Sequence, residues 1–150
     1  DLILLDAFSP SKCPMLWSDE FLSHLAKKLA PKGRLITYSS AAAVRASLKR
    51  AGLELGSIKP LDKNSSQWSV GTIAMSPSTK EKENSKEISW EALSPMELEH
   101  LLTRAAIPYR DPTGHGNTKE IIDRRQKERK YSDLEATKTW KQRWEKTLAA

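Results

Sequence analysis

The sequence contains little cysteine, histidine or glycine. Cys13 is its single cysteine, and the three histidines stand apart along the chain. A lone thiol cannot form an internal disulfide, and a structural metal site needs several ligands at short, regular spacings. We therefore expect neither a disulfide framework nor a bound metal ion.

The six glycines never form a G-x-G-x-x-G run after an apolar segment. That run makes the turn that holds the phosphates in dinucleotide-binding folds. If a nucleotide-like cofactor binds, we expect sequence before Asp1 to supply most of its site. The chain also starts inside an apolar run with no polar turn before it, which is the pattern of a truncated domain.

Long hydrophobic runs are missing as well. No apolar stretch reaches the ~18–20 residues that a membrane-spanning helix needs, and no basic-then-apolar leader is present. These features predict a soluble, cytoplasmic protein with no membrane partner. Its 150 residues, 38% of them hydrophobic, are enough for one domain with a modest core.

Basic side chains are in excess, and the net charge is +6. Residues 1–60 hold nine basic and five acidic side chains, residues 61–117 six and eight, and residues 118–150 ten and six. Lys and Arg near phosphates release condensed counterions, so the two basic ends suit a polyanionic partner. Ordinary surface charge explains the same numbers, and both explanations stay open.

An apolar run opens the chain, and a carboxylate ends it. Leu2 to Leu5 is continuous and is followed by Asp6, which is typical of a strand buried on both faces of a parallel sheet. A helix capped by Ser18 follows, then a second buried strand at 35–38 and a helix that Gly52 ends. This order predicts a βαβα unit.

Two further strands, 53–58 and 68–75, are joined by the polar loop 62–67. Because no helix fits between them, we expect an antiparallel pair. The order of elements predicts an α/β fold whose mostly parallel sheet ends in an antiparallel hairpin. We assign residues 1–76 to this domain.

The rest of the chain has a different composition. Residues 77–88 are polar and of low complexity, which predicts a flexible linker. Residues 89–150 are expected to form a helical extension, with helices capped at three positions: Ser94, Asn117 and Ser132.

The last expected helix carries Trp140 and Trp144 between basic residues. A helical aromatic stripe of this kind favours docking, either on the missing half of the domain or on a partner. Binding of nucleic acid is the alternative.

Asp6 lies at the expected carboxyl end of the first strand, where open α/β sheets bind their ligands. Phe8 and Pro10 follow, so the carboxylate sits in a stiff turn beside an aromatic ring. Partial desolvation there would make it a stronger base, able to take a proton from an amine. The alternative is that Asp6 only ends the strand and caps the turn.

Three later residues are candidates for substrate contact. Trp17 could stack on a planar base, although a core anchor is the slightly better interpretation. Ser40 precedes the amides of a helix that could hold an anion, and Arg45 lies one turn inside that helix, within reach of phosphate. A simple cap and a solvated arginine are the alternatives.

Several segments of the sequence together match the motifs of one family. They are the residues from Asp6 to Pro10 (D-A-F-S-P), then Trp17, and the runs 35–41 (L-I-T-Y-S-S-A) and 44–45 (V-R). They resemble the MnmC/MnmD family of tRNA wobble-uridine methyltransferases. The resemblance implies a Rossmann-like domain that uses S-adenosylmethionine, with residues 1–76 as its carboxyl-terminal half. The substrate it implies is the aminomethyl group of a modified wobble uridine in tRNA.

By this resemblance Asp6 is the catalytic acidic residue at the substrate amine. The substrate-binding residues would be Phe8, Pro10, Trp17, Ser40 and Arg45, and Asp6 with Ala7 would touch the cofactor. The sequence departs from the family at Cys13, Ala42 and Ala46, which stand where Asn, Gly and Arg are usual. The loop 62–67 also lacks the usual basic cluster, which weakens the tRNA assignment more than the methyltransferase assignment.

Two other functions are compatible with the residues. A spermidine-synthase-like aminopropyltransferase also ends its corresponding strand in Asp, but it normally has a second Asp where residues 8–10 stand. The other alternative is a basic module without catalysis, whose helical tail binds RNA or a protein.

Overall fold

The computed structural model describes residues 1–62, 67–77 and 90–149. Within these ranges five strands form one sheet in the order β1-β2-β4-β3-β5. The strands are β1 (Leu2–Leu5), β2 (Arg34–Thr37), β3 (Glu54–Ile58), β4 (Gly71–Met75) and β5 (Trp90–Ala92).

The directions of the strands follow the expected pattern in part. β1 and β2 are parallel, and β4 runs antiparallel to both β2 and β3, so β3 is parallel to β1 and β2. The predicted antiparallel pair is therefore β3 with β4. The α/β class and the antiparallel hairpin are confirmed. Among the described strands the sheet is less parallel than expected, because the β1–β2 pairing is parallel and the β2–β4, β3–β4 and β3–β5 pairings are antiparallel.

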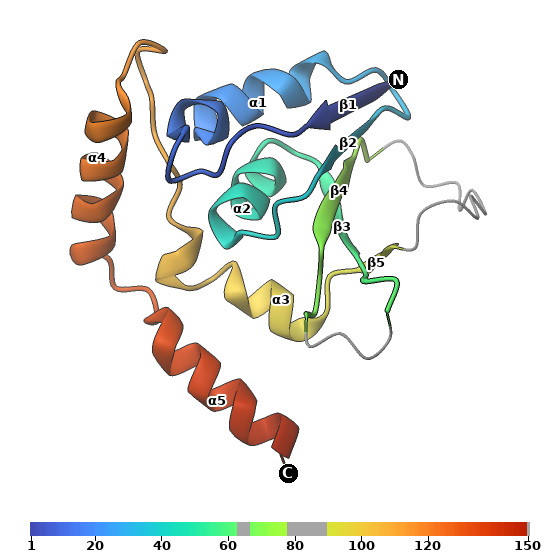
Figure 1. Ribbon diagram of the computed structural model, residues 1–150, viewed down its shortest axis with the longest axis vertical. Coiled ribbons are helices and arrows are strands. Elements are labelled where there is room, and N and C mark those ends of the chain that lie inside the picture. Colours follow the sequence, from blue (N-terminus) through green and yellow to red (C-terminus); the bar gives the residue numbers. More distant parts are fainter. Residues whose placement is uncertain (63–66, 78–89, 150) are drawn as a thin grey trace.

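Two helices pack against the sheet, α1 (Asp19–Lys28) and α2 (Ala42–Arg50), as Figure 1 shows. Ser18 caps α1 as predicted, because its side chain accepts a hydrogen bond from the amide of Phe21. Gly52 follows α2 with φ +89°, a left-handed conformation that suits glycine at the end of a helix. The core between sheet and helices contains Leu5, Trp17, Leu22, Leu35, Val44, Leu48, Leu53 and Ala74.

β1 lies at the edge of the sheet and pairs with β2. Leu5 faces the core and is 8% exposed, whereas Leu2 and Leu4 are 55% and 68% exposed. The expectation that this strand is buried on both faces is wrong for the residues described. The reason is that a strand at the edge, covered by helices on one side, leaves its other face to solvent.

The described part of the tail, residues 90–149, contains three α-helices, α3 (Pro95–His100), α4 (Thr118–Lys130) and α5 (Thr137–Ala149), and a short 3₁₀ helix, η2 (Arg104–Ala106). The predicted caps Ser94 and Asn117 are confirmed, and each forms a capping box with the glutamate three residues later. The predicted cap at Ser132 is wrong, because α5 begins at Thr137 and the Ser132 hydroxyl accepts from the amide of Leu134.

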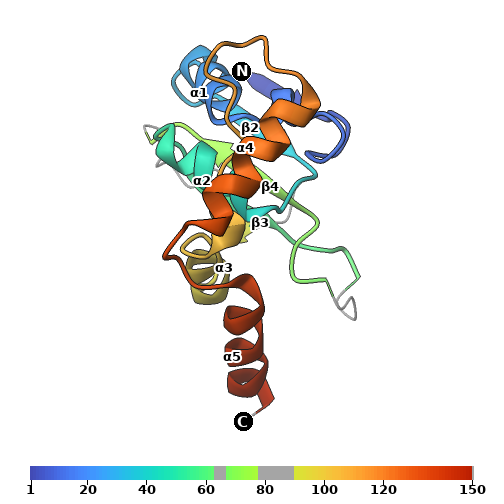
Figure 2. The same ribbon diagram turned by 90° about the vertical axis from the view of Figure 1, so that its left-hand side faces the viewer.

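The tail packs on the α/β domain. β5 pairs with β3 and so extends the sheet, and Ala106 of η2 packs against Ala42 and Ala46 of α2. These two alanines are departures from the family pattern, and both lie under the tail. Figures 1 and 2 show α4 beside the α/β domain and α5 projecting at the end of the molecule farthest from β1.

Most of the predicted linker, 77–88, lies outside the described residues, so its flexibility stays a prediction. No helix among the described residues is long and apolar enough to cross a membrane.

Candidate active site

An open cleft of about 500 Å³ lies where β1 and β2 end. Because the two strands are parallel, their carboxyl ends meet at the same edge of the sheet, which is where α/β proteins bind ligands. The cleft is lined by Asp6, Ala7, Phe8 and Ser9 after β1, by Leu16 of the 3₁₀ helix η1 (Pro14–Trp17), and by Tyr38 after β2.

Two aromatic side chains hold the loop that follows Asp6. The indole Nε1 of Trp17 donates to the carbonyl of Phe8 at 2.7 Å, and the hydroxyl of Tyr38 donates to the carbonyl of Ala7 at 2.9 Å. The rings of Trp17 and Tyr38 meet edge to face, with centroids 5.9 Å apart. The backbone beside Asp6 is thus fixed from two elements.

Asp6 and Phe8 are exposed residues of this loop. The Asp6 side chain is exposed, and Phe8 is 78% exposed, so both are accessible at the mouth of the cleft. The described residues alone do not provide the desolvated surroundings that we expected for Asp6. A carboxylate beside an accessible aromatic face remains, and this pair can receive a cationic or amine group attached to a ring.

Trp17 is 0% exposed and belongs to the core. It therefore cannot stack on a base in this arrangement, and its contribution to the cleft is to position Phe8. Pro10 lies in the turn beside the lining residues, where the carbonyl of Ser9 accepts from the amides of Lys12 and Cys13.

Tyr38 has a place in the cleft that the sequence analysis missed. The available signal was its position directly after the second parallel strand, at the same edge as Asp6. Ser40, which is half-buried, does not cap α2, since the N-cap of that helix is Ala41 without a side-chain hydrogen bond. The hydroxyl of Ser39 instead accepts from the amide of Ala41 at 3.4 Å.

Arg45 is the second predicted contact that the structure places in the interior. It is 2% exposed and forms an ion pair of 2.9 Å with Glu97 of α3. Its other donors reach protein acceptors, which are the hydroxyls of Thr72, Ser57 and Ser69 and the carbonyl of Gly71. The geometry directs the guanidinium away from solvent, so the expected phosphate contact is not supported.

Glu97 is the matching buried anion. Burial raises the pKa of its carboxyl, but hydrogen bonds from Ser57, the Ser94 amide and Arg45 outweigh burial, so the pKa lies below its ordinary value. In the sequence, Glu97 stands three residues after the predicted cap Ser94, which indicates a capping box and no buried ion pair. Its ion pair with Arg45 joins residues 52 positions apart, and no local pattern indicates it.

This buried pair connects the tail to the edge of the cleft. Arg45 Nε donates to Thr72 Oγ1 at 2.8 Å, and the Thr72 hydroxyl donates to the carbonyl of Ser39 at 2.7 Å. Ser39 directly follows Tyr38, which lines the cleft. A chain of hydrogen bonds therefore runs from Glu97 in the tail to the loop that carries Tyr38.

Comparison with known proteins gives matches to one group. Residues 1–69 match the model of a family described as "S-adenosyl-L-methionine-dependent methyltransferase". The chain is 46% identical over 52 residues to the tRNA 5-methylaminomethyl-2-thiouridine biosynthesis bifunctional protein MnmC of Campylobacter hominis, and 47% identical over 55 residues to that of an Azoarcus species. These alignments cover 35% and 37% of this chain but 8% and 9% of the relatives.

The crystal structure of MnmC2 from Aquifex aeolicus is similar to this one. The TM-score is 0.71 at 29% sequence identity, and the alignment covers 88% of this chain and 39% of that chain. The likeness therefore extends beyond residues 1–69 into the tail. The aligned part of the chain covers less than half of this structure's length, and about a tenth of the length of the curated relatives.

The parallel strands that end in a carboxylate-bearing cleft, together with these matches, show a Rossmann-like fold similar to that of S-adenosylmethionine-dependent methyltransferases. Within that class the chain is similar to MnmC proteins over the aligned residues.

Proposed function

We propose that the protein transfers a methyl group from S-adenosylmethionine to an amine on a modified tRNA, the aminomethyl group of a wobble uridine. The observation that carries this proposal is the position of Asp6, exposed at the mouth of a cleft formed by the carboxyl ends of two parallel strands. The names of the relatives, which refer to tRNA 5-methylaminomethyl-2-thiouridine biosynthesis, support the choice of substrate.

The lining of the cleft fits the reactive end of the cofactor. It offers one carboxylate, the hydroxyls of Ser9 and Tyr38, and the ring of Phe8. A carboxylate and an aromatic face suit a positively charged sulfonium and an amine. Asp6 and Ala7 are the residues of this chain that would hold the cofactor, which supplies the methyl group when it is bound.

Asp6 has two tasks in this mechanism. A protonated amine has no lone pair for attack, so its proton must leave, and a carboxylate within hydrogen-bond reach can accept it. The same contact orients the nitrogen for in-line attack. Phe8 lies two residues away with its ring exposed, and we assign it to packing against the pyrimidine ring of the substrate.

The two supporting aromatic residues keep Asp6 in place during this step. Trp17 and Tyr38 hold the carbonyls of Phe8 and Ala7, so the backbone after Asp6 cannot relax away from the substrate without breaking both hydrogen bonds. Positioning of this kind matters because an error of about 1 Å can cost a hundredfold in rate.

The test is to identify the product made by the natural full-length protein. Undermethylated tRNA would be incubated with S-adenosylmethionine, digested to nucleosides and examined by mass spectrometry. We expect the mass of one methyl group to be added to the wobble uridine. Addition to another nucleotide would refute the proposed wobble-uridine substrate, but methyl transfer to tRNA would still be supported as the class of reaction.

Two other results would support rival functions. Binding of tRNA without any binding of S-adenosylmethionine would favour a non-catalytic module. Transfer of an aminopropyl group to a polyamine would favour the aminopropyltransferase.

A further inference from the structure

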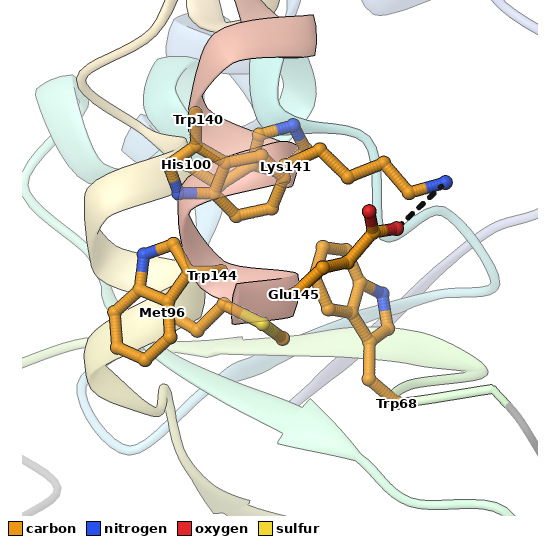
Figure 3. A pocket seen from close by; sticks show the side chains of 7 residues that line it. All are labelled: Trp68, Met96, His100, Trp140, Lys141, Trp144 and Glu145. Atoms are coloured by element: carbon orange, nitrogen blue, oxygen red, sulfur yellow. Dashed lines mark ion pairs between the residues drawn. The ribbon is translucent and has the colours of Figure 1, made fainter. Parts of the chain in front are cut away.

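A second pocket, of about 530 Å³, lies between the tail helices and the loop before β4. Its walls are mainly aromatic and apolar, and they come from Met96 and His100 of α3, from Trp140 and Trp144 of α5, and from Trp68 (Figure 3). α5 lies at the end of the molecule farthest from β1 in both ribbon views. This pocket is thus separate from the Asp6 cleft.

The aromatic side chains of the pocket are packed in fixed orientations. His100 stacks on Trp140 with ring centroids 4.3 Å apart and planes at 12°, and Trp68 approaches both rings at 5.7 Å. Trp144 is held through its Nε1, which donates to Glu99 at 2.9 Å. A ligand therefore meets preformed ring faces, and little ordering of these side chains is needed on binding.

Polar features of the pocket indicate what it accepts. Burial, with the charge of Arg45, lowers the pKa of His100 and so favours the uncharged imidazole. Trp140 is 3% exposed, and its Nε1 has no hydrogen-bond acceptor among the residues that the structure describes. A cluster of uncharged aromatic rings suits a flat, neutral ring as its ligand.

The surroundings of the pocket are basic. The α5 segment contains Lys138, Lys141, Arg143 and Lys146 against a single acidic residue, Glu145. Lys141 and Glu145 pair across 3.7 Å at the pocket itself. Lys138 and Lys146 are exposed and have no ion pair within the described part of the chain, so they can meet phosphates.

We propose that this pocket binds an unpaired base of the RNA substrate by stacking, while the lysines of α5 contact the flanking phosphates. The proposal rests on tRNA being the substrate, and it adds a second contact far from the cleft that carries Asp6. Stacking on aromatic side chains is the common way in which proteins bind unpaired bases, and nearby cations fix the backbone.

The test measures binding of tRNA to the natural full-length protein, without cofactor, at two salt concentrations. Trp144→Leu removes a ring face but keeps an apolar side chain, and we expect it to weaken binding by about 5- to 150-fold, the range for one stacked base. Trp144→Phe should restore most of the affinity. The matched control is Trp90→Leu on β5, outside the pocket, which should bind normally.

A second pair of variants tests the phosphate contacts. Lys138→Gln and Lys146→Gln should each lower the slope of log affinity against log salt by about 1. Binding of Trp144→Leu within twofold of the wild type, at an unchanged melting temperature, would overturn the proposal. Because binding is measured without methyl transfer, a failure of the catalytic assignment would not affect this result.

Discussion

Removal of Glu97 is the change for which the structure predicts the largest loss of stability. Its carboxylate accepts hydrogen bonds from Arg45 at 2.9 Å, from Ser57 at 2.7 Å and from the Ser94 amide at 2.9 Å. The Arg45 and Glu97 side chains are 2% and 1% exposed. Glu97→Ala leaves a buried guanidinium without its counterion, which typically costs about 3–5 kcal/mol.

The assay is urea denaturation followed by circular dichroism, combined with hydrogen exchange of the α3 amides. We expect Glu97→Ala to lower the free energy of unfolding by that amount and to remove protection from α3, because Glu97 also completes the capping box with Ser94. Glu91→Ala is the matched control, since this glutamate is exposed on the neighbouring strand β5. It should change stability little.

A double variant separates charge from packing. Arg45→Met with Glu97→Leu removes both charges and keeps the volume, so it should recover most of the stability that Glu97→Ala loses. If Glu97→Ala costs no more than Glu91→Ala, the buried ion pair does not join the tail to the domain, and the reasoning fails.

The pH dependence of stability follows from the same residue. The pKa of Glu97 in the folded protein is below its ordinary value of 4.5. The unfolded chain therefore binds the proton more tightly, and the contribution of Glu97 is complete above about pH 4.5 and is lost as the pH falls through the lower, folded pKa. Glu97→Gln should flatten the stability curve in that acid range.

Three further substitutions test other parts of the structure. Trp17→Phe removes the donor to the Phe8 carbonyl, and we expect a loss of about 1 kcal/mol in unfolding experiments with a lower kcat at similar KM. Ala46→Arg forces a long side chain under Ala106, so limited proteolysis should show η2 released from α2; an unchanged digestion pattern would contradict this packing. Leu4→Lys should reduce self-association of the isolated 150-residue chain in sedimentation experiments, because Leu4 is 68% exposed on an edge strand; association equal to that of the wild type would contradict this.

Sequence signals that act between near neighbours predicted most of the helices and strands well. Two examples are the cap at Ser94, with a glutamate three residues later, and the glycine after α2. Each involves residues within about one helical turn, so the local sequence is enough to predict it. Apolar runs closed by polar residues likewise located β1 and β2. The start of α5 was misplaced because Ser132 has the chemistry of a cap but binds the Leu134 amide instead.

Non-local contacts could not be predicted from the same patterns. Arg45 looked like a solvent-facing or phosphate-binding residue, and only the folded chain brings Glu97 to it from 52 residues away. Trp140 was expected to dock on a missing half or a partner, but it packs on Trp68 and His100 of its own chain. Both residues contact partners that lie far away in the sequence, and this distance hides the contacts from local patterns.

The central claim is that Asp6 handles the substrate amine. Its most direct test is a single-turnover measurement of methyl transfer to tRNA by the natural full-length protein and by Asp6→Asn, with Asp133→Asn as the exposed control. We predict that Asp6→Asn slows transfer by about 10²–10⁴-fold, with S-adenosylmethionine affinity within a few-fold of the wild type. A rate for Asp6→Asn equal to that of the control, at saturating cofactor and tRNA, would contradict the account.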